Sequence, residues 1–422
     1  MTVEKESIIT DKGRVSLHPE KRIVFLDVLR GLSIFGIFLA NLQWFSFSFL
    51  GVGGKYVFPE TDGKLSFLYA VFIDGKFYSI FSLLFGWGIA LQMDRLHHMG
   101  MHYLKYIYRR LYFMLLLGAI HLFFIWEGDI VFFYALVGFI LVYFRNYSNR
   151  TLVKVATLLL LSPILLYALK MVFPLFNYPA IVLTDFGNYL YKINGLTDPY
   201  SKSVAYLKSE SVLTDVWLNL CDFPYRYADL FFVSRIPKVL GAMLTGFVIG
   251  RSGVYKKLSQ YKKQLLFFAV LVTVIALPLN YFLALLAESP KAYYALEVEG
   301  LYYTVLYAFA VFPLAMAYVV GLALLFESGR IRFILALFAP VGKMAFSNYI
   351  MQSAIGIFTF YGIGIGMMYQ MGPFSWTLLA IGILVLQIIV STLWLRYFRF
   401  GPIEWVWRSL TYSRMQPLRI KL

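Results

Sequence analysis

Residues 264–287 read QLLFFAVLVTVIALPLNYFLALLA, a stretch of 24 residues without a charged side chain. A helix that crosses the hydrocarbon core of a bilayer needs about 20 apolar residues. Nine further apolar stretches alternate with polar loops, at 23–47, 66–93, 110–126, 130–144, 151–174, 230–250, 300–326, 341–366 and 374–396. The pattern predicts an all-α fold, a polytopic integral membrane bundle of about ten transmembrane helices.

Lys and Arg gather in every second loop. Of the 38 Lys and Arg residues, 26 fall on one side of the predicted spans, 7 fall on the other side and five lie within spans. The positive-inside rule places the basic loops in the cytoplasm. We therefore expect a multi-pass protein of the bacterial cytoplasmic (inner) membrane, with the N- and C-termini both cytoplasmic.

The composition excludes an ordinary soluble domain, since 60% of the residues are hydrophobic and 14% are charged. The net charge of +16 comes from basic residues spread over many loops, so the expected partners are membrane lipids with anionic head groups and no nucleic acid. A single cysteine, Cys221, excludes a disulfide framework or a Cys-based metal site. We expect no metal and no tightly bound cofactor, and the sequence does not indicate an oligomeric state.

The spans divide into two halves of about five each. The first half covers 21–174 and the second covers 230–398, with an extracytoplasmic insertion at 175–229 between them. A cytoplasmic tail at 1–20 and an interfacial tail at 399–422 complete the chain. The insertion is read either as a lid over the bundle or as a connector that rests on lipid.

Ionisable side chains inside spans cost roughly 2.5–3.5 kcal/mol each on insertion scales, so they usually pair, face a cavity or serve a function. Helical rise places those of this chain in two layers. The outer layer holds Asn41, Asp74, Lys76, His121, Glu127, Asp129, Arg235 and Lys238, and the inner layer holds Asp27, Arg30, Lys343 and Asn348. Gly75, between Asp74 and Lys76, predicts a break in its helix.

Several of these residues also fit plain structural roles. Asp27 and Arg30 are three positions apart and would pair on one helix face. Lys343 would reach the interface, and Asn348 would bond a neighbouring helix together with Gln352. Glu127 and Asp129 would end a helix in water.

Two features favour function more strongly. Arg235 and Lys238 carry positive charge on the outer side, against the orientation rule, and would bind an anion or neutralise Asp74. His121 is the only histidine within a span, and imidazole is suited to exchange protons near neutral pH. A neutral histidine bonded to a carbonyl is the alternative for His121.

Six strings along the chain resemble the YeiB family of bacterial membrane proteins. They are RIVFLDVLRG at 22–31, GKFYSIFSLLFG at 75–86, RLYFMLLLGAIH at 110–121, GDIVFFY at 128–134, GKMAFSNYIMQS at 342–353 and GPIEWVWR at 401–408. The YeiB fold is similar to that of a broader transmembrane acyltransferase group, which includes the lysosomal heparan-α-glucosaminide N-acetyltransferase. The resemblance implies transfer of an acyl unit from a cytoplasmic donor, acyl-CoA, to an extracytoplasmic sugar or other hydroxyl acceptor.

The resemblance suggests roles for both layers. His121 would act as the general base, and Asp74 would orient it. Asn41, Lys76, Asp129, Arg235 and Lys238 would bind the acceptor substrate, while Asp27, Arg30, Lys343 and Asn348 would bind the donor. One departure concerns the base: the lysosomal enzyme has its histidine after the first span, whereas residues 42–73 here contain none.

Two other classes remain open from the sequence. A transporter or a lipid- or small-molecule-binding membrane protein would use the same polar cavity without chemistry. A structural membrane subunit would pair its polar groups internally and leave no cavity. A continuous tunnel with a pantetheine-like or lipid-like occupant would separate these possibilities.

Overall fold

The computed structural model describes residues 23–47, 58–287 and 296–420, so the predicted tail at 1–20 lies outside the described residues. In these ranges every regular element is a helix, apart from one isolated bridge between Phe398 and Arg419. The predicted all-α class is confirmed.

The helices up to residue 177 are α1 (Val24–Phe45), α2 (Pro59–Phe72), α3 (Lys76–His98), α4 (Tyr103–Phe124), α5 (Val131–Tyr143), η2 (Phe144–Asn146), α6 (Asn149–Val172) and η3 (Pro174–Asn177). The insertion contributes α7 (Tyr178–Ile193), α8 (Pro199–Lys208) and α9 (Val212–Phe232). The remaining helices are α10 (Arg235–Ser252), η4 (Val254–Lys257), α11 (Lys262–Ala287), α13 (Val298–Glu327), α14 (Arg332–Ala336), α15 (Ala339–Lys343), α16 (Ala345–Phe360), α17 (Pro373–Tyr397) and α18 (Pro402–Tyr412).

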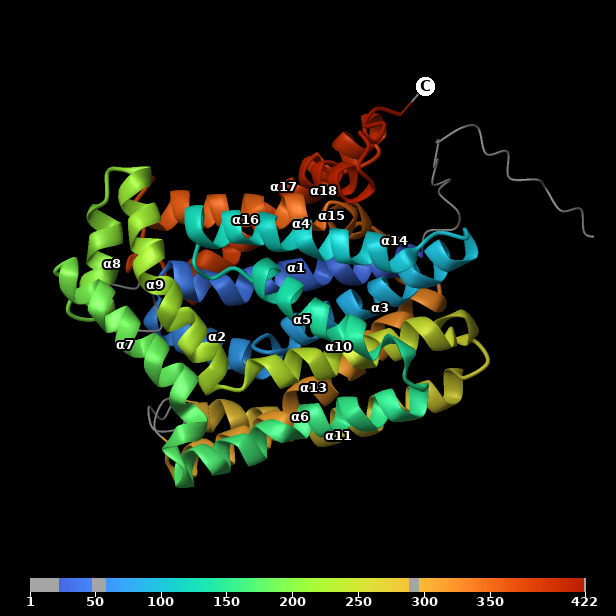
Figure 1. Ribbon diagram of the computed structural model, residues 1–422, viewed down its shortest axis with the longest axis horizontal. Helices are drawn as coiled ribbons and strands as arrows, with labels where there is room; N and C mark the ends of the chain where they lie inside the picture. Colours follow the sequence, from blue (N-terminus) through green and yellow to red (C-terminus); the bar gives the residue numbers. More distant parts are fainter. Residues whose placement is uncertain (1–22, 48–57, 288–295, 421–422) are drawn as a thin grey trace, which may run out of the picture.

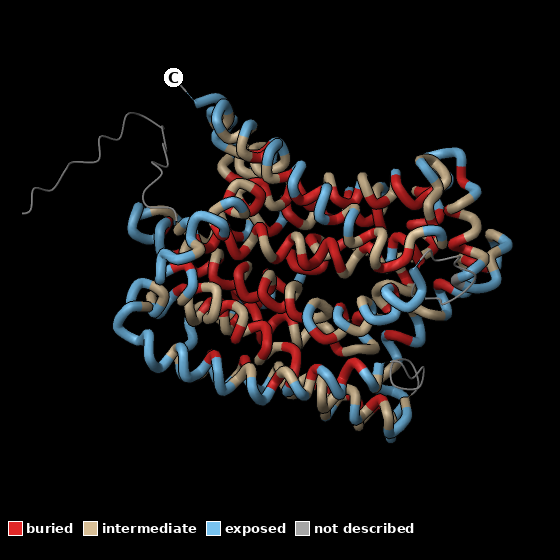
Figure 2. Tube along the Cα trace, turned by 180° about the vertical axis from the view of Figure 1, so that it is seen from behind, coloured by how far each residue is buried: buried red, intermediate tan, exposed pale blue. Residues whose placement is uncertain are grey.

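The long helices run side by side along the longest axis of the molecule (Figure 1). α6 and α11 form one edge, α1, α3 and α10 lie in the middle, and α4, α16 and α17 form the other edge. Burial follows this order (Figure 2): 67% of the apolar window of α1 is buried, against 11% for α11. Because α11 is almost entirely apolar yet exposed, its outer face requires lipid.

Seven helices of the described chain are long and apolar enough to cross a membrane, and up to nine crossings result when two bent pairs are counted. The bends lie between α9 and α10 (67°) and within the segment from Arg332 to Phe360 (82°). The predicted spans at 230–250 and 341–366 therefore belong to broken helices rather than straight ones. α5, with 13 residues, is shorter than a full crossing requires.

The predicted break at Gly75 is present. α2 ends at Phe72, and α3 starts at Lys76 after Gly75 adopts φ 81°, a left-handed conformation that glycine tolerates best. The junction places Asp74 between the two helices and Lys76 at the first position of α3. This gives the outer layer of polar residues one of its irregular backbone segments.

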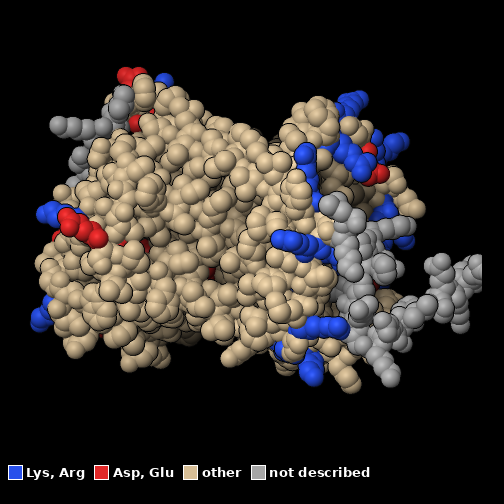
Figure 3. Space-filling view, turned by 90° about the horizontal axis from the view of Figure 1, so that it is seen from above, with Lys and Arg blue, Asp and Glu red and all other residues tan. Residues whose placement is uncertain are grey.

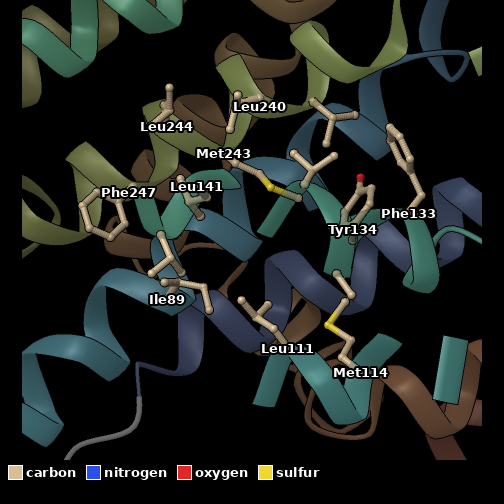
Figure 4. Close-up of a cluster of buried hydrophobic side chains, with 14 of the residues drawn as sticks. Ile89, Leu111, Met114, Phe133, Tyr134, Leu141, Leu240, Met243, Leu244 and Phe247 are labelled. Atoms are coloured by element: carbon tan, nitrogen blue, oxygen red, sulfur yellow. The ribbon is translucent and has the colours of Figure 1, made fainter. Parts of the chain in front are cut away.

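α3 and α10 approach each other at backbone contact. A Cβ atom on Gly86 would lie 1.8 Å from the Met243 carbonyl oxygen, and one on Gly246 would lie 1.8 Å from the Leu83 carbonyl oxygen. The small residues thus serve packing within the chain, as GxxxG patterns do in membrane helices. Beside this contact, apolar side chains of α3, α4, α5 and α10 form the largest buried cluster (Figure 4).

Charged side chains lie at the two ends of the bundle. On the face in Figure 3, Lys and Arg collect at both ends, and the surface between them is nearly free of charge. We call the end with α7, α8 and α9 the insertion end, and the end with the loops at 99–102 and 253–261 the basic end. An uncharged belt between polar ends is typical of a protein surrounded by a bilayer.

The orientation itself is a prediction that labelling can test. In a Cys221→Ala background, we expect Lys192→Cys of the insertion end to react with an impermeant maleimide in intact cells, and Lys257→Cys of the basic end to react only after lysis. Both side chains are exposed, so access and not burial decides the result. Labelling of position 257 in intact cells, with position 192 protected, would show that the orientation is the opposite of the predicted one.

Candidate functional site

A buried Ser–His–Asp arrangement lies towards the insertion end of the bundle. His121, in the last turn of α4, places Nδ1 2.8 Å from Oδ2 of Asp129 and Nε2 3.0 Å from Oγ of Ser353 in α16. The exposed fractions are 0% for His121, 2% for Asp129 and 2% for Ser353. A nucleophile, a base and an orienting carboxylate in this order make up the catalytic triad of many acyl-transfer enzymes.

Local structure fixes His121 and Asp129. The backbone N–H groups of Ile125 and Trp126 donate to the carbonyl of His121 and end α4 there. The other carboxylate oxygen of Asp129 accepts the backbone N–H of Phe132 at 2.6 Å, at the N-terminus of α5. One oxygen of Asp129 therefore anchors a helix while the second holds the imidazole.

Tyr349 covers the imidazole, with its ring centroid 5.0 Å from that of His121. It lies one turn before Ser353 in α16, and Ser353 Oγ also has the Tyr349 carbonyl oxygen at 3.3 Å. The serine hydroxyl thus has two acceptors available, a helical carbonyl and the imidazole. Proton transfer from Ser353 to His121 requires the second of these hydrogen bonds.

The carboxylate that lies beside the imidazole of His121 is that of Asp129 and not that of Asp74. Both ring nitrogens of His121 are occupied, by Asp129 and Ser353, so no nitrogen is left for Asp74. Asp74 interacts electrostatically with Lys76 instead. Lys76 is fully buried and donates to the Ala70 carbonyl oxygen at 2.7 Å, which ties the start of α3 to the end of α2.

The structure places the other predicted outer residues elsewhere. Asn41 is half-buried in the last turns of α1. Arg235 stacks over the ring of Tyr78 at 4.6 Å, and Lys238 over the ring of Tyr307 at 4.2 Å. The hydroxyls of these two tyrosines are 2.6 Å apart. Arg235 and Lys238 thus share one aromatic cluster at the start of α10.

The inner layer contains a cluster of three arginines that the sequence did not group. Arg30 pairs with Asp27 at 3.0 Å, as predicted. The charges of Arg30 and Arg408 both act on Arg110 in α4, which stacks over the Trp407 ring of α18 at 4.5 Å. Several guanidinium groups in close range favour binding of a phosphate-bearing ligand.

Two further residues of the inner layer are Asn348 and Lys343. Asn348 donates to the Val341 carbonyl oxygen and to Ser391 Oγ, each at 3.1 Å. Gln352 donates to Gln387, whose own amide donates to the Asn348 carbonyl oxygen. These bonds join α16 to α17, which is the contact that the structural interpretation of Asn348 and Gln352 expects. Lys343 ends α15 and is half-buried.

A second buried ionic cluster, at the insertion end, was also missed. Lys202 of α8 lies 2.5 Å from Asp222 and 3.1 Å from Glu127, and all three are largely buried. Burial raises the pKa of Glu127, against the opposing charge of Lys202. For Lys202 itself burial acts to lower the pKa, but the two carboxylates outweigh it and raise the pKa above its usual range.

Signals for some of the missed residues exist in the sequence. Arg110, Ser353 and Arg408 each end or begin one of the strings that resemble the YeiB family. Lys202 has no comparable signal, because its partners are more than a helix away along the chain. Within the described residues no group of three or more His, Cys, Asp or Glu side chains could hold a metal ion.

The fold and this polar interior define a polytopic α-helical membrane protein. Residues 249–414 match the family model described as a protein of unknown function, DUF418. The chain is 32% identical over 440 residues to the uncharacterized protein YxaH of Bacillus subtilis (strain 168), covering 96% of this chain and 99% of the relative. It is 28% identical over 428 residues to the uncharacterized protein YeiB of Escherichia coli (strain K12), covering 94% and 98%. The chain belongs to the YeiB family, and no solved structure matches it.

Proposed function

We propose that this protein is an acyltransferase of the bacterial inner membrane that passes an acyl group from a cytoplasmic acyl-CoA to an extracytoplasmic hydroxyl. The observation that carries the proposal is the buried arrangement of Ser353, His121 and Asp129, with hydrogen bonds of 3.0 and 2.8 Å. Asp129 holds the imidazole with Nε2 towards the serine, which is the geometry that activates a hydroxyl for attack.

The reaction runs in two steps. Ser353 Oγ attacks the thioester carbonyl while His121 takes the serine proton and passes it to the departing thiolate, which leaves as a thiol. The acceptor hydroxyl then gives its proton to His121 and attacks the acyl-serine ester, and His121 returns the proton to Ser353. The sum converts a thioester and an alcohol into an ester and a thiol.

The position of the arginine cluster fits the donor. Arg110 and His121 are eleven residues apart on α4. This is about three helical turns, so both lie on the same helix face, separated by about 16 Å along the axis. Phosphates held at Arg110, Arg30 and Arg408 would leave an extended pantetheine arm to reach Ser353.

The experiment that tests this function is mass spectrometry of ligands that co-purify with the protein, followed by incubation with acyl-CoA. The proposal expects binding of acyl-CoA with release of about one free thiol per protein, and continuous thiol release once a hydroxyl acceptor is added. A protein that binds no acyl donor, yet retains a lipid or solute unchanged, would be a transporter or binding protein instead.

The donor site makes a separate prediction. We expect Arg110→Gln to weaken acyl-CoA binding by roughly tenfold or more, because a charge-assisted hydrogen bond is lost. The salt dependence of binding should fall as well. Titration calorimetry in detergent measures both, and Arg150→Gln, an exposed arginine at the basic end, is the control. If a folded Arg110→Gln protein binds acyl-CoA as tightly as the wild type, the arginine cluster does not bind the donor and serves only to anchor α18.

A further inference from the structure

The last helix, α18, is joined to the start of α16, the helix that carries Ser353. Glu404 Oε1 of α18 accepts the backbone N–H groups of Phe346 at 2.6 Å and of Ser347 at 3.2 Å. The hydroxyl of Ser347 donates to the other oxygen of Glu404, Oε2, at 2.5 Å. The same hydroxyl oxygen accepts the backbone N–H of Ile403 at 3.1 Å. We call this set of four hydrogen bonds the α16–α18 junction.

α16 needs this junction because it begins without a cap of its own. The chain bends by 82° between the segment that ends at Lys343 and the helix that starts at Ala345. Met344, the N-cap residue of α16, provides no side-chain hydrogen bond to the first turn. The first N–H groups of a helix have no partner within the helix, and a carboxylate suits them because it also faces the positive end of the helix dipole. The position of the first turn of α16 therefore depends on α18.

α18 also carries part of the arginine cluster. Trp407 Nε1 donates to the Arg110 carbonyl oxygen at 2.9 Å, and the Arg110 guanidinium stacks over the Trp407 ring at 4.5 Å. Arg408 is the next residue along α18, and its charge acts on Arg110. The Trp407 ring meets the ring of Phe346 edge-on, with 6.0 Å between the centroids. α18 thus contacts both the proposed donor site on α4 and the start of α16 (Figure 1).

Ser353 lies two turns further along α16. It is seven residues from Phe346, which corresponds to about 10 Å of helix. A shift of the first turn along the helix axis would therefore change the distance from Ser353 Oγ to His121 Nε2, which is 3.0 Å here. A misplacement of about 1 Å at reacting groups can cost roughly 10²-fold in rate.

We propose that Glu404 is a positioning residue that couples donor binding to the serine nucleophile. Phosphates bound at the arginine cluster fix α18, and Glu404 passes this constraint to the first turn of α16 and so to Ser353. The nucleotide part of the donor takes no part in the chemistry, yet its binding energy would raise the rate of acyl transfer. Three of the strings that resemble the YeiB family, at 110–121, 342–353 and 401–408, meet in this unit. The inference rests on the proposed function and adds a residue to it.

The test compares two acyl donors at saturating concentration. One is acetyl-CoA, and the other is S-acetyl-N-acetylcysteamine, which has the thioester and the end of the pantetheine arm but no phosphate. Mass spectrometry of the peptide that contains Ser353 follows its acetylation over time. We expect wild-type protein to react faster with acetyl-CoA than with the short donor.

Glu404→Gln should lower the rate with acetyl-CoA about tenfold or more, because charge-assisted hydrogen bonds to α16 are lost. The rate with the short donor should stay the same, since that donor does not contact the arginine cluster. The affinity for acetyl-CoA should also stay the same, because Arg110 and Arg408 are both retained. A loss in rate at saturation without a loss of affinity is the signature of a positioning effect.

Two more variants complete the experiment. Glu327→Gln, which changes an exposed glutamate at the end of α13, is the matched control and should retain both rates. Ser347→Ala keeps the carboxylate of Glu404 and its two backbone bonds but removes the hydroxyl that links it to Ile403. It should give a smaller loss of the same kind, and it serves as the test if Glu404→Gln does not fold.

A purely structural Glu404 would lower the rates with both donors by the same factor, and that result would overturn the inference. So would a wild-type protein that reacts equally fast with the two donors. If neither donor acylates Ser353 of the wild type, the proposed function fails. Acylation of Ser353 with the same ratio of the two rates in wild-type and Glu404→Gln protein would refute the coupling alone.

Discussion

Replacement of His121 by Ala is expected to lower acyl transfer by about 10²–10⁴-fold, the usual contribution of a positioned general base. Among the described residues, the imidazole is the only group within hydrogen-bond distance of Ser353 Oγ that can take its proton, since the other neighbour is the carbonyl of Tyr349. Asp129 would remain at the N-terminus of α5 through its bond to Phe132. The loss should therefore fall on turnover and spare donor binding at the arginine cluster.

Thiol release from acyl-CoA in the presence of an acceptor measures this effect. His97→Ala, which removes an exposed histidine at the basic end, is the matched control and should be fully active. A purely structural His121 would lower the unfolding temperature without a specific loss of turnover. Undiminished acyl transfer by a folded His121→Ala protein would remove the triad from the mechanism.

The second large effect concerns stability. Lys202→Met should destabilise the fold by about 3–5 kcal/mol, because removal of one partner leaves buried charges uncompensated. Lys202 bridges Glu127 and Asp222 at 3.1 and 2.5 Å and has a side-chain exposure of 6%. Its loss would separate α8 from α9 and from the loop after α4, close to Asp129.

Thermal unfolding in detergent measures the loss, with Lys192→Met, an exposed lysine of α7, as the control that should change little. Combining Lys202→Met with Glu127→Gln and Asp222→Asn should restore part of the stability, since no unpaired charge then stays buried. If the single Lys202 and Lys192 variants unfold at the same temperature, the cluster is not important for stability.

The elements of this fold could be predicted because each depends on local sequence. The span at 264–287 appears as α11, and Gly75 breaks its helix because it must adopt a positive φ. The span predicted at 341–366 belongs to a segment, from Arg332 to Phe360, that is bent by 82°. There Glu404 of α18 accepts the N–H groups of Phe346 and Ser347 and caps a new helix, a contact across more than fifty residues.

The partners within the site could not be predicted, because they too come together from residues far apart along the chain. His121 was singled out by its type and depth, but Ser353 lies 232 positions away, and its approach depends on how α4 packs beside α16. Depth alone also put Asp74 and Asp129 in one layer. The rotation of each helix and the conformation of the loop before α5 decide which carboxylate contacts the imidazole. A hydropathy pattern gives no information on either.

The most direct test of the central claim is peptide mass mapping after incubation of the purified protein with isotope-labelled acyl-CoA and no acceptor. We predict one labelled acyl group on the peptide that contains Ser353, absent from Ser353→Ala and strongly reduced in Asp129→Asn but not in Asp74→Asn. Addition of a hydroxyl acceptor should remove the label. A Ser353→Ala protein that still transfers the acyl group at the wild-type rate would contradict the account.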